Sequence, residues 1–160
     1  MGQQQLLLVI LVTIIVGIAT VVAINVFGSS AASANRDSVR QDMLSIGAAA
    51  QGWYIKPSMM GGGGNSFEGM SFNDISFPAE KISSIGLSAE NMNGTYVISG
   101  GSATEIVITG HPASDESYIK SAVDGDAGTF TAATESMEAT IVKDGMGEWT
   151  VGGEAEPEPE

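Results

Sequence analysis

An uninterrupted apolar run from Leu6 to Phe27, LLLVILVTIIVGIATVVAINVF, constrains this chain more than any other feature. The run contains no charged residue and begins close to the first methionine. A helix of this length, at about 1.5 Å per residue, matches the roughly 30 Å hydrocarbon core of a bilayer. The run therefore predicts a helix that starts in a membrane.

A cleaved secretory signal is the alternative interpretation of this segment. Such a signal has a basic start, an apolar core of about 7–15 residues and a small-residue cleavage site. Residues 29–34 are small enough for cleavage, but no Lys or Arg precedes the run, and the run is too long for a signal core. We therefore expect the segment to be retained.

Beyond Phe27 the helical pattern continues and becomes amphipathic. Apolar residues follow one another at steps of four, three and four, which is helical spacing: Val39, Met43, Ile46 and Ala50. No proline occurs before Pro57, so one helix is predicted from about Gln3 to Trp53. Its second half is expected to dock on a globular head.

Small and hydroxyl residues interrupt the apolar run on part of its surface. Small side chains at such spacing allow helices to approach closely in a membrane or in an apolar bundle. We predict that this surface packs against other helices, through Leu6, Val9, Thr13, Gly17, Ala19, Ala23 and Phe27.

The remainder of the chain is expected to form a β-rich head. Alternating residues predict a hairpin of strands 95–99 and 105–109, followed by strands at 129–133, 138–143 and 148–151. A turn is predicted at 144–147, and residues 118–123 are ambiguous between strand and helix. The fold class is α+β, with a long N-terminal hydrophobic helix packed on a small antiparallel sheet.

The segment between helix and sheet offers weaker signals. Gly61–Gly64 is expected to be a mobile loop or a place where another chain packs closely. Residues 71–77 and 78–85 are expected to be short turns or helical pieces. Apolar residues here are expected to fill the space between helix and sheet: Phe67, Phe72, Ile75, Phe77, Ile82 and Ile85.

Charge and composition exclude several classes of function. The formal net charge is −13, from 19 acidic and 6 basic residues. Nucleic-acid binding requires Lys and Arg to neutralise phosphates, so we expect no nucleic-acid partner. The chain has no cysteine, which excludes disulfides, zinc–thiolate sites and a cysteine nucleophile.

No set of residues predicts catalysis, and we expect neither an enzyme nor a cofactor. The single histidine, His111, precedes Pro112 and is expected in a polar turn. The sequence from Asp124 matches the pattern of a calcium-binding loop only in part, because Gly128 replaces a ligand and Thr129 replaces the turn glycine. We therefore predict no metal site. Asn93-Gly94-Thr95 is a possible glycosylation sequon in a turn that looks exposed.

The short lead Gly2-Gln3-Gln4-Gln5, the apolar run and the amphipathic stripe together resemble type IV pilins and related filament subunits. The resemblance implies a peptidase cut after Gly2, with Gln3 as the new N-terminus. The glutamate usual at the fifth mature position is absent, since Leu7 stands there. The basic leader and the mid-helix proline of that family are also missing.

The resemblance implies a structural subunit of an extracellular filament that polymerises through its N-terminal helix. Its partners would be copies of itself and, before assembly, the pilus assembly machinery and the cytoplasmic membrane. Two alternatives stay open: a single-pass anchored exported binding domain, and a pseudopilin of a secretion system. Four segments are predicted: the apolar helix 1–28, its amphipathic continuation 29–56, the head 57–151 and a disordered acidic tail 152–160.

Overall fold

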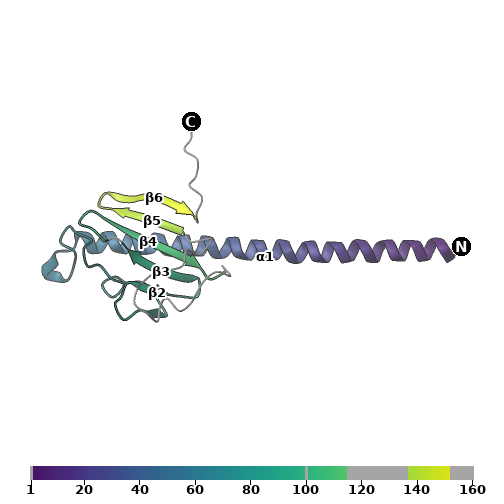
Figure 1. The fold of residues 1–160 in the computed structure, drawn as a ribbon, viewed down its shortest axis with the longest axis horizontal. Coiled ribbons are helices and arrows are strands. Elements are labelled where there is room, and N and C mark those ends of the chain that lie inside the picture. The colour runs from purple at the N-terminus through teal and green to yellow at the C-terminus, as the bar shows by residue number, and fades with distance from the viewer. Residues whose placement is uncertain (1, 100, 115–136, 152–160) are drawn as a thin grey trace, which may run out of the picture. The chain divides into compact units, whose positions relative to one another are not determined.

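A computed structural model describes residues 2–99, 101–114 and 137–151 of the chain (Figure 1). The chain divides into two compact units, Met1–Ala34 and Asn35–Glu160. The first unit is helical, and the second contains the sheet together with the end of the helix.

A single helix, α1, extends from Gly2 to Ile55, as the absence of proline predicts. It ends where Lys56 precedes Pro57, because the residue before a proline is pushed out of the helical region. A short 3₁₀ turn, η1 (Ser58–Met60), follows.

Within the described residues, the sheet has six antiparallel strands in sequential order: β1 (Lys81–Ile82), β2 (Ser88–Glu90), β3 (Gly94–Ser99), β4 (Glu105–Pro112), β5 (Met137–Val142) and β6 (Gly145–Val151). Each strand pairs with the next one along the chain. The predicted α+β class and the β3–β4 hairpin are confirmed, with Tyr96 opposite Gly110 and Ile98 opposite Ile108.

The core of the second unit lies between one face of the sheet and the stripe of α1. Alternate strand residues face the helix because successive side chains of a strand point to opposite sides. The buried core comprises Val39, Met43, Ile46, Ala50, Phe67, Met70, Phe72, Ala89, Tyr96, Ile98, Ile106, Ile108, Met137, Ala139 and Ile141.

Two expectations about the strands were wrong. The turn predicted at 144–147 is shorter, because Val142 pairs with Gly145 and β6 begins there. Strand β1 replaces part of the turns or helical pieces expected at 78–85, and β2 lies in a segment for which no strand was predicted. Because β1 pairs with β2 and β2 pairs with β3, backbone pairing rather than an alternating pattern holds the two strands. Ile82 and Ile85, expected in the core, are 36% and 43% exposed.

The glycine run Gly61–Gly64 is packed against the end of α1 and is not a free loop. Gly63 N–H donates to the Trp53 carbonyl at 2.9 Å, and Gly64 N–H donates to the Lys56 carbonyl at 2.9 Å. A Cβ on Gly63 would collide with the ring of Trp53 in the last turn of α1 and with the Ser66 carbonyl oxygen. The close approach that glycine permits here is therefore to the chain's own helix end.

The strand predicted at 129–133 and the ambiguous segment 118–123 lie outside the described residues. The same holds for the predicted acidic tail.

Candidate membrane and assembly segment

The first unit is exposed along nearly all of its described length, and its surface is largely apolar from Leu6 to Phe27. Sixteen large apolar side chains lie between Leu6 and Phe27, and their exposed fractions range from 48% for Val12 to 75% for Phe27. No Asp, Glu, Lys or Arg occurs before Arg36. The helix is long and apolar enough to span a membrane, and none of its most apolar window is buried within the chain.

The residues predicted to pack between helices all lie on this exposed surface. Leu6 is 64% exposed and Val9 is 58% exposed. Gly17 has no atom within 4 Å of the position that a Cβ would occupy, and Ala19 and Ala23 are exposed. Within the described chain nothing covers this surface, so its packing partner is either lipid or another molecule.

Hydroxyl groups in the apolar helix are satisfied internally. Thr13 Oγ1 donates to the Ile10 carbonyl, and Thr20 Oγ1 donates to the Val16 carbonyl, both at 2.8 Å. Such bonds remove the cost of placing a hydroxyl in an apolar surrounding. The two threonines are therefore compatible with lipid and with an apolar bundle.

The residues predicted for processing lie in the first turn of α1. The helix begins at Gly2 and continues through Gln3. A peptidase that cuts between them would act on a helix end, where unwinding costs little.

The four residues predicted to pack on the head are fully buried: Val39, Met43, Ile46 and Ala50. Two of them, Val39 and Met43, approach β4 closely at Gly110. A Cβ there would lie 2.6 Å from Met43 Sδ and 2.9 Å from Val39 Cγ1. The glycine lets the helix approach the sheet more closely than any side chain would allow.

A polar clamp, which the sequence did not reveal, fixes this helix to the turn between β2 and β3. Asp42 Oδ2 accepts hydrogen bonds from Asn91 Nδ2 and Asn93 Nδ2 at 2.8 Å each, and from the Tyr96 hydroxyl at 2.7 Å. Tyr96 is fully buried. Three donors on one carboxylate oxygen fix the position of α1 along the head, because a helix shifted by one residue would lose all three.

The turn that carries these donors is itself held in shape. Asn91 Oδ1 accepts from the backbone N–H groups of Asn93 and Gly94, at 2.9 and 3.1 Å, which is an Asx turn. Asn35 Nδ2 donates to the Asn93 carbonyl at 2.9 Å. Two sequence features could have indicated this clamp: the turn pattern Asn91-x-Asn93-Gly94, and the position of Asp42 beside the apolar stripe.

This arrangement bears on the possible glycosylation of Asn93. The side chain is half-buried, and the Nδ2 that would carry a glycan donates to Asp42. The sequon therefore does not lie in an exposed turn, and a glycan at Nδ2 would have to displace that contact.

A second contact joins the end of the helix to the β5–β6 turn. Gln51 Nε2 donates to the Val142 carbonyl and, at 3.2 Å, to the Gly145 carbonyl. Together with the Asp42 clamp, this side chain holds both ends of the docked helix segment to the sheet.

His111 was expected in a polar turn, but it belongs to β4. It lies opposite Thr95 on β3 and is 2% exposed. Within residues 2–99, 101–114 and 137–151, no group of three or more acidic or histidine side chains is placed to hold a metal ion. The suggested calcium loop from Asp124 lies outside the described residues.

The chain matches no family model, no curated protein and no solved structure in comparisons with known proteins. The fold defines an α+β protein with an apolar N-terminal helix long enough for a membrane and a β-sheet packed on the second half of the same helix.

Proposed function

We propose that this chain is a structural subunit of an extracellular filament resembling a type IV pilus. The helices of residues 2–34 form the core of the polymer and the heads form its outside. One observation carries the proposal: the apolar helix is exposed on every side, whereas the head completes its own core with the rest of α1.

The exposed surface is too costly to leave in water. Burial of an apolar surface contributes about 25 cal/mol per Å², so sixteen large side chains amount to tens of kcal/mol per chain. A helix that is apolar all round must be surrounded, because docking on one neighbour would cover only one face. A bilayer or a bundle of copies supplies such an environment.

Two features favour copies as the final environment. The small side chains of Gly17, Ala19 and Ala23 allow another helix to pack closely against this one. Contact with lipid does not require such small side chains. The charges also lie outside this segment, since every Asp, Glu, Lys and Arg follows Asn35. An apolar core with an acidic, hydrated exterior follows directly from this division.

In this proposal, subunits that have not yet assembled are held in the membrane. Before assembly each chain spans the cytoplasmic membrane, and assembly machinery transfers the helix from lipid to the growing bundle. In this scheme the chain needs no cofactor and performs no catalysis.

A second candidate is a single-pass anchored domain whose head stays in the cytoplasm, and one observation favours it. Arg36 and Arg40 lie on the head side of the apolar run. The positive-inside rule places such a basic flank in the cytoplasm, so this candidate differs from the exported anchored domain considered above. A pseudopilin would share the architecture proposed here and differ in filament length and abundance.

Electron microscopy of material sheared from the surface of cells that produce the chain tests the proposal. We expect thin filaments, and N-terminal sequencing should yield a chain that keeps Leu6–Phe27 and begins at Gln3 if processing occurs. Dispersed chains that remain in the membrane fraction, with the head accessible only from the cytoplasm, would establish the anchored domain instead.

A further inference from the structure

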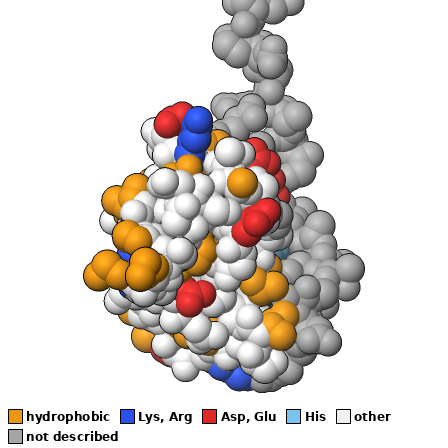
Figure 2. Space-filling model, turned by 90° about the vertical axis from the view of Figure 1, so that its left-hand side faces the viewer, with side chains coloured by type: hydrophobic (Ala, Val, Ile, Leu, Met, Phe, Trp, Pro, Cys, Tyr) orange, Lys and Arg blue, Asp and Glu red, His pale blue; other side chains and the backbone are white. Residues whose placement is uncertain are grey.

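The carboxyl end of α1 carries a group of exposed apolar side chains, here called the methionine knob: Ile55, Met59 and Met60. Their exposed fractions are 70%, 98% and 69%. Figure 2 looks onto this end of the head, and hydrophobic side chains protrude from it among acidic and basic ones. Apolar side chains clustered in this way on a folded head mark an interaction surface.

The knob is held by a hydrogen-bonded framework. Met60 N–H donates to the Pro57 carbonyl at 2.9 Å, and Gly61 N–H donates to the Ser58 carbonyl at 3.0 Å. Gly61 adopts φ +74°, which closes the turn without strain only because it lacks a Cβ. Asn65 N–H returns to the Tyr54 carbonyl at 2.8 Å. The methionines are therefore displayed on an ordered scaffold, which lowers the entropic cost of binding.

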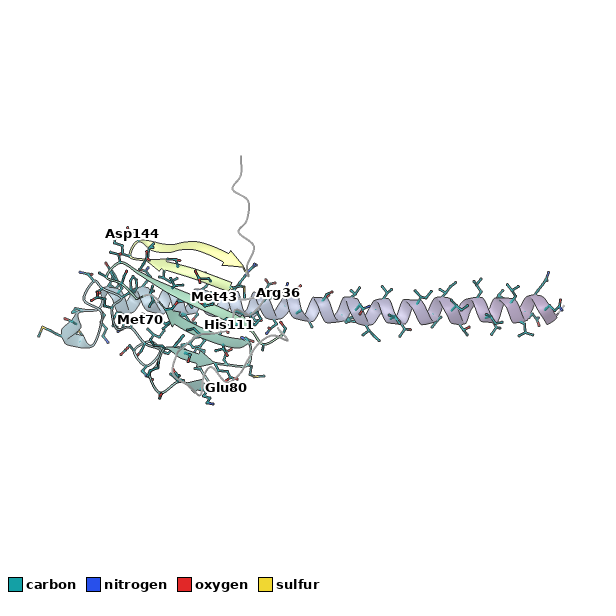
Figure 3. All side chains as sticks on the ribbon, viewed as in Figure 1. Arg36, Met43, Met70, Glu80, His111 and Asp144 are labelled. Atoms are coloured by element: carbon teal, nitrogen blue, oxygen red, sulfur yellow. The ribbon has the colours of Figure 1, made fainter. Side chains whose placement is uncertain are left out.

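The same head has a groove with a volume of ≈ 320 Å³. Its lining is mixed: apolar side chains come from Phe67, Met70, Ile85, Leu87 and Ile98, and the rest of the wall from Gly69, Ser71, Ser99 and Gly101. Figure 3 shows Met70 in the part of the head below the helix. The knob does not fill the groove of its own chain, since Met59 is almost wholly exposed. Methionine is flexible and polarizable, so it adapts to irregular apolar grooves.

The charges beside the two surfaces are opposite. Lys56 is exposed at the base of the knob, next to Ile55 in the sequence. Glu68 is exposed between two lining residues, Phe67 and Gly69. Asp74 is exposed and accepts hydrogen bonds from the backbone N–H and the hydroxyl of Ser71, which also lines the groove. Complementary charges of this kind fix the register of a contact more than they strengthen it.

We propose that the methionine knob of one copy inserts into this groove on the next copy, with Lys56 facing Glu68 or Asp74. The inference rests on the proposed filament function. Two different surfaces of one chain make a heterologous contact, and such contacts generate open polymers when they do not close into a ring. Each head in a filament thus offers a knob to one neighbour and a groove to another.

The natural absence of cysteine makes a clean cross-linking test possible. Two differently tagged full-length chains are co-expressed, one with Met60→Cys and the other with Ile85→Cys. Sheared material is treated with a short bismaleimide, and the denatured products are probed for both tags. The matched control replaces Met60→Cys by Met92→Cys, because Met92 is 84% exposed on the same head but lies outside the knob.

We expect the Met60 pair to give at least ten times more doubly tagged product than the Met92 pair. Equal yields, no product, or a cross-link from Met60 only to another protein would overturn the proposal. Imaging of the same samples separates the two claims. Abundant filaments without the Met60 cross-link refute the knob contact alone, whereas the absence of filaments in the unsubstituted chain refutes the filament function and, with it, this inference.

A second pair of variants removes dependence on the introduced cysteines. Met59→Glu combined with Met60→Glu places negative charges against Glu68 and Asp74 and should reduce the sedimentable filament at least tenfold. Met92→Glu should leave it unchanged. An unchanged yield for the double variant would contradict the contact. Because the substituted side chains are exposed, the head is expected to fold in each case.

Discussion

Asp42→Ala should lower the free energy of unfolding of the head more than any other single substitution at an exposed or half-buried position of α1. The substitution removes the acceptor for three hydrogen bonds, from Asn91, Asn93 and Tyr96. Water can reach the two half-buried amides, but the Tyr96 hydroxyl belongs to a fully buried residue.

The magnitude follows from these differences in burial. A hydrogen bond to a charged group contributes about 1.5–3 kcal/mol, and a buried donor left without a partner costs about 1–3 kcal/mol. With the amides largely rescued by water, the free energy of unfolding of the head should fall by about 2–4 kcal/mol. That is a large share of the roughly 5–15 kcal/mol available to a domain.

Urea denaturation of the full chain in detergent, followed by near-ultraviolet circular dichroism, measures this change. Asp37→Ala is the matched control, because Asp37 lies on the same helix with 76% side-chain exposure and only a 3.8 Å ion pair to Arg40. It should change the free energy of unfolding by less than about 0.5 kcal/mol. A double-mutant cycle with Tyr96→Phe should show coupling to Asp42. Equal effects of Asp42→Ala and Asp37→Ala, or no coupling, would refute the clamp.

Further substitutions and one mass measurement test other parts of the structure. Gly110→Val should destabilise the head by about 1–3 kcal/mol in the same denaturation assay, because its Cβ would crowd Met43 and Val39. The control Gly52→Ala has open space at its Cβ and should be neutral or stabilise by up to about 1 kcal/mol. Ile15→Arg should lower membrane insertion, with a cost of about 2.5–3.5 kcal/mol at the centre of a span, whereas Gln41→Arg, on an exposed helical position of the head, should insert normally in an alkaline-extraction assay. The intact mass of the purified chain should show no glycan on Asn93, since its Nδ2 is bonded to Asp42, and a glycosylated Asn93 would show that this contact does not form.

Much of the architecture could be predicted from local pattern. The apolar run and the spacing of Val39, Met43, Ile46 and Ala50 predicted the helix, and alternation predicted the β3–β4 hairpin. These signals are strong because apolar residues recur several times at the spacing of a helix or at the alternation of a strand. The class of the fold followed from them.

The remainder depended on contacts between distant residues. Strands β1 and β2 are too short to alternate, and they are defined by the pairing of β1 with β2 and of β2 with β3. The Asp42 clamp joins residues about fifty positions apart. The segment Gly61–Gly64 was expected to be mobile because the sequence does not show that backbone carbonyls at the end of α1 accept hydrogen bonds from its N–H groups. His111 looked like a turn residue because Pro112 follows it, but a proline is tolerated at the end of a strand.

The account rests on the apolar helix leaving lipid to be buried among copies of itself. The direct measurement is the labelling of Val12→Cys by a water-soluble maleimide in membrane-free material sheared from cells, read together with particle mass. We predict a large, lipid-free particle in which Cys at this position is protected until the particle is dissociated. A lipid-free chain that labels at once as a monomer, or recovery of the chain only within membranes, would contradict the account.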